Sequence, residues 1–302
     1  MSIVEAGTLH MRILVTGSSG FIGRNLVERL GPEHEVLAPR HAELDLQDGE
    51  AVARYLDDAQ VDAVVHSATK PGHRNARDPS GLLEANTRMF ANLTRRRDLC
   101  GRVVLLTSGL VYDQRYYSPK MREDRFGEHV PADEGGYSKY LCARMAESIP
   151  GAVELRPFGV FGPHEDWEIR FISNAICKCI FDLPITLRQD RLFDYVWVDD
   201  LSDVIRRAVV GDLPAGAYNV TPDATVSLRV VAEKVRRTSG KGIEIRVAQP
   251  GMGVEYSGDN ARLRRALTDF RFTNVDEAIG RLYRWYEARR GELKRELLLS
   301  DK

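Results

Sequence analysis

The chain has almost no net charge, few cysteines and no long apolar run. Its 43 basic and 44 acidic side chains nearly cancel, and the formal net charge is −1. No global field therefore draws the protein to nucleic acid or to an anionic membrane, and we expect it to bind neither. No apolar run reaches the roughly 20 residues that a membrane-spanning helix requires. These shortages favour a soluble globular protein.

The four cysteines lie on apolar segments, without a Cys-x-x-Cys pair or a histidine at ligand spacing. We therefore predict no metal site and interpret the cysteines as reduced thiols of a cytoplasmic protein. The first ten residues, MSIVEAGTLH, lack the basic start and apolar middle of a secretory signal. Because Met11 abuts the first predicted strand, residues 1–11 are interpreted as an N-terminal extension.

Short apolar segments alternate with segments of helical periodicity in the first half of the chain. RILVT (12–16) is followed by apolar residues at helical spacing, and the alternation continues to AVELR (152–156). Apolar strands separated by helices indicate a parallel sheet that is covered on both faces. Beyond residue 156 the alternation loosens, which indicates a smaller lobe. Strands are predicted at 12–16, 35–38, 62–66, 102–107 and 152–156, with helices near 48–57, 81–97 and 136–148.

The segment TGSSGFIG (16–23) joins the first predicted strand to the first predicted helix. Gly17 permits a tight turn, Gly20 lets a pyrophosphate approach the backbone, and Gly23 lets the helix meet the sheet. The helix N-terminus adds hydrogen-bond donors and a positive dipole end. An ordinary glycine turn is the weaker interpretation, because the segment follows the first strand of a parallel α/β chain. We predict a dinucleotide site.

Arg40 ends the second predicted strand. Dinucleotide sites often carry an acidic residue there, which binds the ribose 2′-hydroxyl, whereas an arginine suits a 2′-phosphate. Arg40 therefore favours NADP, with NAD as the alternative. Taken alone, an arginine in this loop can equally be solvated.

Several motifs, in order along the chain, resemble those of one family. TGSSGFIG resembles its Thr-Gly-x-x-Gly-x-x-Gly turn, VVHSAT (64–69) its His-x-Ala strand, and LLTSGLVYD (105–113) the strand that bears the catalytic serine or threonine. LRPFGVFGP (155–163) and VWVDDL (196–201) resemble two further motifs. The chain is thus similar to the extended short-chain dehydrogenase/reductases that act on nucleotide sugars. It most resembles the GDP-fucose synthase and dTDP-4-dehydrorhamnose reductase branches.

The resemblance implies a fold and a division into domains. The expected fold class is α/β, a Rossmann doubly wound parallel sheet with a smaller C-terminal α/β substrate lobe. Residues 12–160 would form the NAD(P)-binding domain, and 193–220 would return to it. Residues 161–192 and 221–302 would form the substrate lobe. The helices 81–97 and 136–148 would build a homodimer interface.

The resemblance also assigns roles to individual residues. Ser108 would hydrogen-bond the C4 oxygen of the sugar, and Lys139 would bind the nicotinamide ribose and lower the pKa of a catalytic tyrosine. The expected cofactor-binding residues are Gly17, Ser19, Gly20, Phe21, Ile22, Gly23, Arg40, Asp45, Leu46, Ser67, Ala68 and Lys139. The expected substrate-binding residues are Asn86, Ser108, Asn174, Arg188 and Arg191.

The segment EGGYSKY (134–140) departs from the family pattern. The catalytic tyrosine should stand four residues before Lys139, on the same face of the helix, and that position holds Gly135. In one interpretation Tyr137 swings in as the proton donor. In a second, Ser108 or a water molecule donates more slowly. In a third, turnover has been lost, or the glycine is a replacement that traps a bound substrate.

The residues after Ser108 narrow the reaction. Family dehydratases carry an Asp-Glu pair there, and Gly109 and Leu110 cannot transfer protons. The fucose synthase branch uses a nearby cysteine for C3/C5 epimerisation, and no cysteine follows Ser108. We therefore predict NADPH-linked reduction of a nucleotide-linked 4-keto sugar. The alternatives are a C4 epimerase that holds NAD tightly and a regulator that binds NADP or a sugar nucleotide without turnover.

Overall fold

The computed structural model describes residues 10–73 and 75–299, so nearly all of the N-terminal extension predicted for residues 1–11 lies outside the described residues. At its centre is a six-stranded sheet of order β10-β5-β4-β3-β1-β2 in which every pairing is parallel. The predicted α/β class with a parallel sheet is confirmed. The strands are β1 (Arg12–Thr16), β2 (Glu35–Leu37), β3 (Ala63–His66), β4 (Arg102–Leu106), β5 (Val153–Pro157) and β10 (Gly216–Val220).

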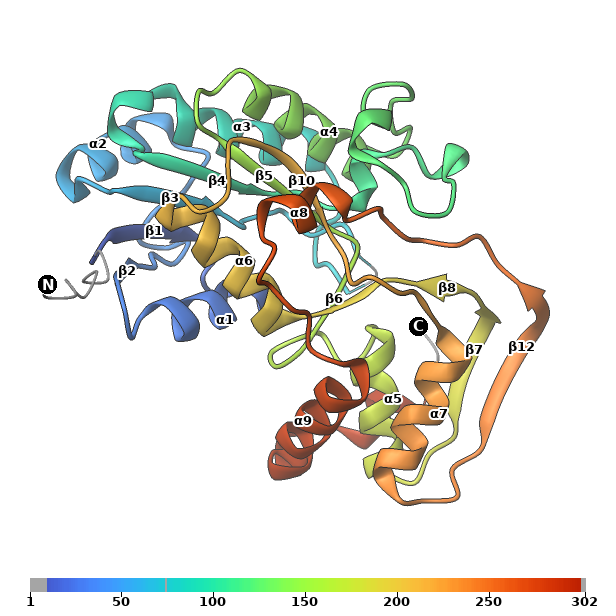
Figure 1. The fold of residues 1–302 in the computed structure, drawn as a ribbon. Helices are drawn as coiled ribbons and strands as arrows, with labels where there is room; N and C mark the ends of the chain where they lie inside the picture. Colours follow the sequence, from blue (N-terminus) through green and yellow to red (C-terminus); the bar gives the residue numbers. More distant parts are fainter. Residues whose placement is uncertain (1–9, 74, 300–302) are drawn as a thin grey trace, which may run out of the picture.

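Helices cover both faces of this sheet (Figure 1). The helices α1 (Phe21–Leu30) and α6 (Val198–Val210) lie on one face, and α2 (Gly49–Ala59), α3 (Leu82–Arg95) and α4 (Glu134–Glu147) lie on the other. Because both faces are covered, the strands can be apolar throughout. Their predicted bounds agree with the structure to within a few residues.

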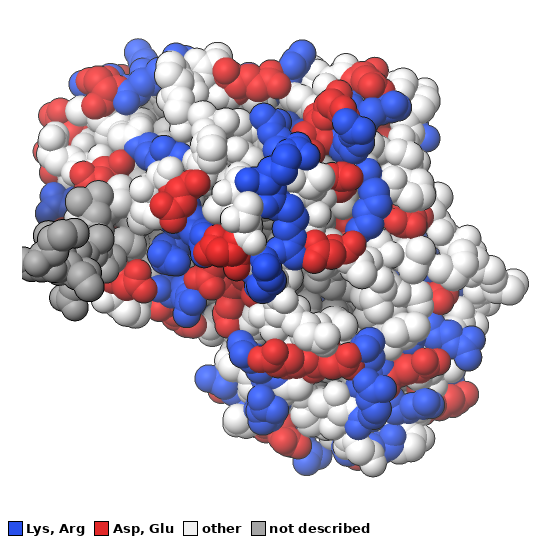
Figure 2. Space-filling view, in the orientation of Figure 1, with Lys and Arg blue, Asp and Glu red and all other residues white. Residues whose placement is uncertain are grey.

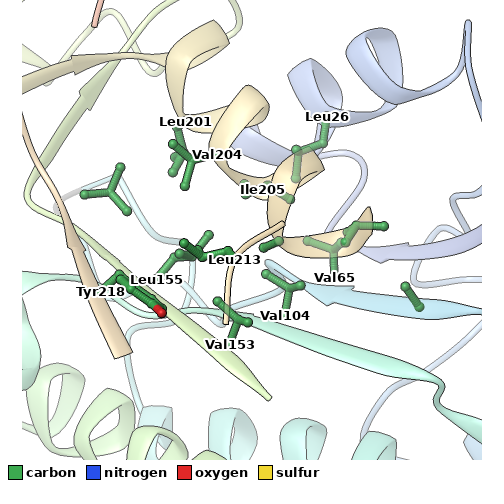
Figure 3. Packing of buried hydrophobic residues seen from close by; sticks show 14 of the residues in the cluster. Leu26, Val65, Val104, Val153, Leu155, Leu201, Val204, Ile205, Leu213 and Tyr218 are labelled. Carbon is green, nitrogen blue, oxygen red and sulfur yellow. The ribbon is translucent and has the colours of Figure 1, made fainter. Parts of the chain in front are cut away.

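The core beneath α1 and α6 is built from aliphatic side chains (Figure 3). Leu26 of α1 and Ile205 of α6 point toward Val65 and Val104 on the strands, and all four are fully buried. Each such side chain contributes about 1.5–3 kcal/mol by leaving water. This packing fixes the first helix against the sheet, and with it the turn that precedes the helix.

The second lobe has its own hydrophobic cluster, with α5 (Phe171–Ile180), α7 (Leu228–Ser239) and α9 (Val275–Ala288) around a parallel pair of strands, β7 (Ile185–Asp190) and β12 (Ile245–Met252). It lies below the carboxyl edge of the main sheet in Figure 1.

The segment 193–220 divides between the two parts of the molecule. Its helix α6 and strand β10 lie on the main sheet, whereas the predicted strand FDYVWV forms two short strands that pair elsewhere. β9 (Tyr195–Trp197) pairs with β6 (Gly159–Phe161). β6 follows β5 in sequence but lies outside the main sheet, and so does β9. β8 (Leu192–Phe193) pairs with β11 (Val226–Ser227).

The predicted dimer helices turn much of their apolar surface inward. Leu82 and Phe90 of α3 are buried, and Met145 of α4 packs against the core cluster on that face of the sheet. Leu83 and Leu141 are half-buried and remain available to an interface. The homodimer therefore stays a prediction that rests on few apolar residues.

Basic and acidic side chains are interspersed over the face shown in Figure 2, where a strip of basic residues is bordered by acidic ones. Ion pairs such as Arg207–Asp269 and Arg264–Asp223 join residues of opposite sign. None of the helices in the described ranges is long and apolar enough to cross a membrane.

Candidate functional site

The glycine-rich turn lies at the point where the strand order reverses. β1 is followed in sequence by β2 on one side and, after a crossover, by β3 on the other. Open α/β sheets bind ligands outside the carboxyl ends of strands at such a switch point. The structure thus places the residues after β1 and β3 at the expected ligand edge.

Two of the glycines in the turn are required by its geometry. Gly17 has a φ of 73°, in the left-handed region that favours glycine, and its carbonyl accepts a hydrogen bond from the Gly20 amide at 3.0 Å. A Cβ at Gly23 would lie 2.0 Å from the Gly17 carbonyl oxygen. Any side chain at position 23 would therefore push α1 away from the turn. No acidic residue occupies the first turn of α1, so no carboxylate of that turn offsets the positive end of the helix dipole.

Arg40 lies beside this turn. The Ser18 hydroxyl donates to the carbonyls of Ala38 and Pro39 at 3.1 and 3.3 Å, which ties the turn to the end of β2. The Arg40 side chain is exposed, and within the described part of the chain its guanidinium has no hydrogen-bond or ion-pair partner. An arginine guanidinium without a partner is a group that can pair with a phosphate.

The ends of β1 and β3 are locked together by Thr16. Its hydroxyl lies 2.8 Å from His66 Nδ1, and its carbonyl accepts a hydrogen bond from the Ser67 hydroxyl at 2.6 Å. The Ala68 amide donates to the Thr16 hydroxyl at 3.3 Å. Burial, reinforced by the charge of Lys139, lowers the pKa of His66 to about 3. His66 is therefore a neutral structural residue that holds the predicted Ser67 and Ala68 contacts in place.

The other predicted cofactor residues lie around the same edge. Leu46 is buried, and its carbonyl accepts a hydrogen bond from Asn92 at 2.9 Å, while Asp45 is exposed. Ser19 is exposed, and Phe21 and Ile22 are half-buried at the start of α1.

Ser108 and Lys139 come from two segments that touch. Ser108 follows β4 and caps the short helix η2 (Gly109–Val111), where its hydroxyl accepts a hydrogen bond from the Leu110 amide at 3.2 Å. A Cβ at Gly136 would lie only 2.9 Å from the Leu110 carbonyl oxygen, so the first turn of α4 is pressed against η2. This contact brings the Lys139 helix to the Ser108 loop.

Lys139 is half-buried, and burial lowers its pKa. Across the described ranges its ammonium has no ion-pair or hydrogen-bond partner. An unpaired, partly desolvated cation is costly to the fold, and such groups cluster at functional sites.

The structure does not bring Tyr137 to the Lys139 side of the helix. α4 is continuous from Glu134, capped by an Asp133 hydrogen bond to the Gly136 amide at 2.7 Å. Two residues along a helix turn the side chain by about 200°. The Tyr137 ring accordingly stacks on Tyr140, with ring centroids 6.4 Å apart.

Position 135 itself has room for a side chain. A Cβ there would lie 3.4 Å from Asp133 Oδ1 and 4.0 Å from Leu82 Cδ1, which are ordinary contacts. A Cβ at position 135 therefore meets no steric barrier, and the phenol is missing because the sequence has a glycine there.

Four predicted substrate residues hold different positions. Asn86 is buried and fastens loops, since its Oδ1 accepts from the Lys70 amide at 2.7 Å and its Nδ2 donates to Ser138 at 3.2 Å. Asn174 donates to the Trp167 and Glu168 carbonyls. Arg188 is exposed on β7, whereas Arg191 lies over the Phe193 ring at 4.6 Å.

Sequence reasoning missed an aromatic cluster next to Ser108. Tyr256 packs against Tyr117 at 5.2 Å, Phe158 at 4.9 Å and Phe193 at 5.2 Å between ring centroids. These residues come from four separate segments, and the segment 254–258 matches no motif. A glycine directly after the predicted catalytic serine was the available signal, because it leaves a space that another residue must fill.

His129 is exposed, and its ring stacks on that of Tyr116 with ring centroids 3.7 Å apart. Within residues 10–73 and 75–299, no group of three or more histidine, cysteine, aspartate or glutamate residues is placed to hold a metal ion.

Comparisons with known proteins agree with this geometry. The model of the NAD dependent epimerase/dehydratase family matches residues 13–221. The chain is 26% identical over 297 residues to a GDP-6-deoxy-D-talose 4-dehydrogenase of Aggregatibacter actinomycetemcomitans, covering 91% of this chain and 97% of that protein. A GDP-L-fucose synthase of Azorhizobium caulinodans is 38% identical over 85 residues, so the match spans only 27% of either chain.

The fold is shared with a GDP-mannoheptose C4 reductase from Campylobacter jejuni that was solved with NADP bound. The TM-score is 0.79 at 19% identity, over 92% of this chain and 98% of that one. The family resemblance of the sequence motifs is confirmed, and the chain belongs to the NAD dependent epimerase/dehydratase family.

Proposed function

We propose that this protein reduces a nucleotide-linked 4-keto sugar with NADPH. The observation that carries the proposal is the contact between the first turn of α4, the helix of the unpaired Lys139, and η2, which Ser108 caps after β4. A ketone under reduction gains negative charge on its oxygen, and this site offers a hydroxyl and a cation to receive that charge. The relatives named above act, by their names, on GDP-linked sugars.

The residues of the turn fit a dinucleotide. Gly17 and Gly23 let the turn pack directly on the backbone of Ala68 and of α1. The free end of α1 offers amides to a pyrophosphate. When bound there, the nicotinamide supplies the hydride. Arg40 would hold the adenosine 2′-phosphate, Ser108 would orient the carbonyl oxygen, and Lys139 would stabilise the charge that develops on it.

The missing phenol supports a second candidate function. Gly135 leaves the Lys139 side of α4 without an acid, so a regulator that binds NADP or a sugar nucleotide without consuming it has a specific basis. Loss of one general acid costs about 10²–10⁴ in rate, against total accelerations of 10⁶ or more. Reduction therefore remains the better-supported proposal.

Oxidation of NADPH by the purified protein, over a panel of GDP-, dTDP-, UDP- and CDP-linked 4-keto sugars, tests the proposal. We expect turnover on at least one of them, with a reduced sugar as the product. Interconversion of C4 epimers without net NADPH consumption would instead identify an epimerase. Tight binding of NADPH with silence on every sugar would favour the regulator.

The substitution Arg40→Ala tests the cofactor assignment. We expect KM for NADPH to rise by about 10- to 100-fold while KM for NADH changes little, because a charge-assisted hydrogen bond contributes about 1.5–3 kcal/mol. Steady-state kinetics with both cofactors measure this. Arg54→Ala, an exposed arginine on α2, is the matched control. Equal changes for NADPH and NADH would refute a 2′-phosphate contact.

A further inference from the structure

Two tyrosine hydroxyls converge on the residue that follows Ser108. The Tyr117 hydroxyl donates to the Gly109 carbonyl. A Cβ at Gly109 would lie 2.8 Å from the Tyr256 hydroxyl oxygen and 2.7 Å from the Phe158 ring. The side-chain position that residue 109 leaves empty is therefore filled by the phenol of Tyr256. The Tyr117 and Tyr256 rings pack against each other, with centroids 5.2 Å apart, so the two hydroxyls share this position.

This pair is held in place by main-chain hydrogen bonds. The Tyr256 amide donates to the Leu192 carbonyl at 3.0 Å, and the Asp194 amide donates to the Tyr256 carbonyl at 3.2 Å. The fully buried Asp194 carboxylate also accepts a hydrogen bond from the Gly258 amide at 2.8 Å. Tyr256 is thus clamped between the segment 192–194 and the aromatic cluster.

The segment that carries Tyr117 is fastened to the same place. The Lys120 amide donates to the Ser257 hydroxyl at 2.8 Å, and the Met121 amide donates to the Ser257 carbonyl at 2.9 Å. The Lys120 ammonium lies 3.3 Å from the Asp194 carboxylate. A hydroxyl pair pinned from both segments is pre-organised, as groups that donate a proton must be.

The Tyr117–Tyr256 pair and the empty phenol position lie on two sides of one short helix. η2 touches α4 through the Leu110 carbonyl at Gly136, and it touches the tyrosines through Gly109. Ser108 precedes η2 directly. A substrate oxygen bound at Ser108 would therefore lie next to residue 109, whose side-chain position the Tyr256 phenol fills, while Gly135 offers no phenol from α4.

We propose that Tyr256, with Tyr117 behind it, donates the proton to the substrate oxygen in place of the phenol missing at Gly135. This inference rests on the proposed reductase function. Hydride adds to the carbonyl carbon, the C=O π electrons move to oxygen, and the Tyr256 O–H bond breaks as the sugar O–H bond forms. Tyr117 then turns its proton from the Gly109 carbonyl to the Tyr256 oxygen and is reprotonated by solvent, which its half-buried position admits.

The protonation of Tyr117 and Tyr256 is consistent with the role of proton donor. Burial raises the pKa of both tyrosines, so each phenol is protonated at neutral pH. A sugar alkoxide is a stronger base than a phenolate, and proton transfer to it is favourable even from a weakly acidic phenol. A proton donor without a lowered pKa needs no lysine beside it, and Tyr256 belongs to a segment separate from α4.

The test uses the sugar that the wild type reduces best. We expect Tyr256→Phe to lower kcat by about 10²–10⁴, with KM changed only a few-fold, because only the acid is removed. Tyr117→Phe should give a smaller loss of about 10-fold, since it removes the proton supply and leaves the donor in place. Tyr116→Phe, an exposed residue of the same loop, is the matched control and should not change kcat.

Rescue distinguishes proton donation from a structural role. The double variant Tyr256→Phe/Gly135→Tyr has a phenol four residues before Lys139, at a position where an added Cβ makes only ordinary contacts, and we expect it to regain turnover. Its kcat for reduction should fall at a lower pH than that of the wild type, because Lys139 would stabilise the new phenolate. Calorimetric binding of the sugar nucleotide checks that each variant keeps an intact site.

The remaining outcomes separate the two proposals. An unchanged kcat in Tyr256→Phe, or a change confined to KM, overturns the donor role and leaves the reductase function standing. A large loss of kcat in Tyr137→Phe, together with a normal kcat in Tyr256→Phe, would identify Tyr137 on α4 as the proton donor. If the wild type reduces no sugar of the panel and Gly135→Tyr does, Tyr256 does not act as the proton donor. If neither the wild type nor Gly135→Tyr reduces any sugar of the panel, the reductase function itself is overturned.

Discussion

Lys139→Met is expected to lower kcat for sugar reduction by about 10²–10³ while the protein stays folded. Removal of one preorganised group that stabilises a developing oxyanion typically costs this much. Lys139 is the cation that α4 brings to the Ser108 loop, and among the described residues no carboxylate neutralises it. Its charge is therefore available to the substrate oxygen and to the cofactor ribose. Single-turnover reduction monitored by NADPH absorbance measures the effect on the chemical step.

The same substitution should not reduce the free energy of unfolding. Burial lowers the pKa of Lys139, so the folded protein bears a desolvation cost that methionine, of similar length, does not have. Arg144→Met is the matched control, because Arg144 is exposed on the same helix and pairs with Glu147 at 2.8 Å. A Lys139→Met protein with wild-type kcat would remove Lys139 from the site, and one that unfolds would show that its role is structural.

The fold could be predicted because its signals are local and repeated. The central strands β1, β3, β4 and β5 are short segments between helices, and most of their residues are buried in the structure. The turn at Gly17 could be predicted for the same reason, since its conformation depends on neighbouring glycines. The strand pairing of the segment 193–198 could not be predicted. The partner of a short apolar strand depends on tertiary contacts made by distant parts of the chain, and not on its own sequence.

Only those residues of the candidate site that belong to a recognisable sequence motif could be predicted. Ser108 and Arg40 each follow the end of a strand, and Lys139 lies on the helix between β4 and β5. Their place along one edge therefore follows from the parallel sheet. Tyr256 lies in a segment without periodicity and reaches Gly109 only through tertiary contacts. Tyr137 is close to Lys139 in sequence but not in space. Because the helix is continuous, residues two positions apart lie on different faces of it.

The pair Glu154–Arg156 shows why this edge tolerates an unusual active site. Both residues are buried, and the guanidinium donates to the carboxylate at 2.6 Å and to the Tyr112 hydroxyl at 3.0 Å. Tyr112 in turn donates to Asn219 at 2.8 Å. This network holds β5, β10 and the end of η2 together independently of Gly135. The loss of a phenol from α4 therefore leaves the surrounding framework intact.

Glu165→Gln is expected to stabilise the folded protein, and by more as the pH rises. Glu165 lies between β6 and α5, is only 7% exposed, and accepts a hydrogen bond from the Ser173 hydroxyl at 2.6 Å. Burial is the largest influence on this carboxyl and raises its pKa to about 8. The folded state therefore holds the proton more tightly than the unfolded state, whose pKa is near 4.5. Because the folded state binds more protons between these two values, the free energy of unfolding falls as pH rises from 4.5 through 8.

Glutamine cannot ionise, so the variant should lose this part of the pH dependence. Each unit of pKa difference corresponds to about 1.4 kcal/mol, and we expect the variant to exceed the wild type by about 2–5 kcal/mol at pH 8.5 and by little at pH 4.5. Urea unfolding at pH 4.5, 7 and 8.5 measures the difference, with the exposed Glu287→Gln as the matched control. Equal stability of Glu165→Gln and wild type at pH 8.5 would show that Glu165 ionises without cost in the fold. Asp194, whose pKa burial raises to about 6, would then be the next carboxyl to replace, and its titration would end near pH 6.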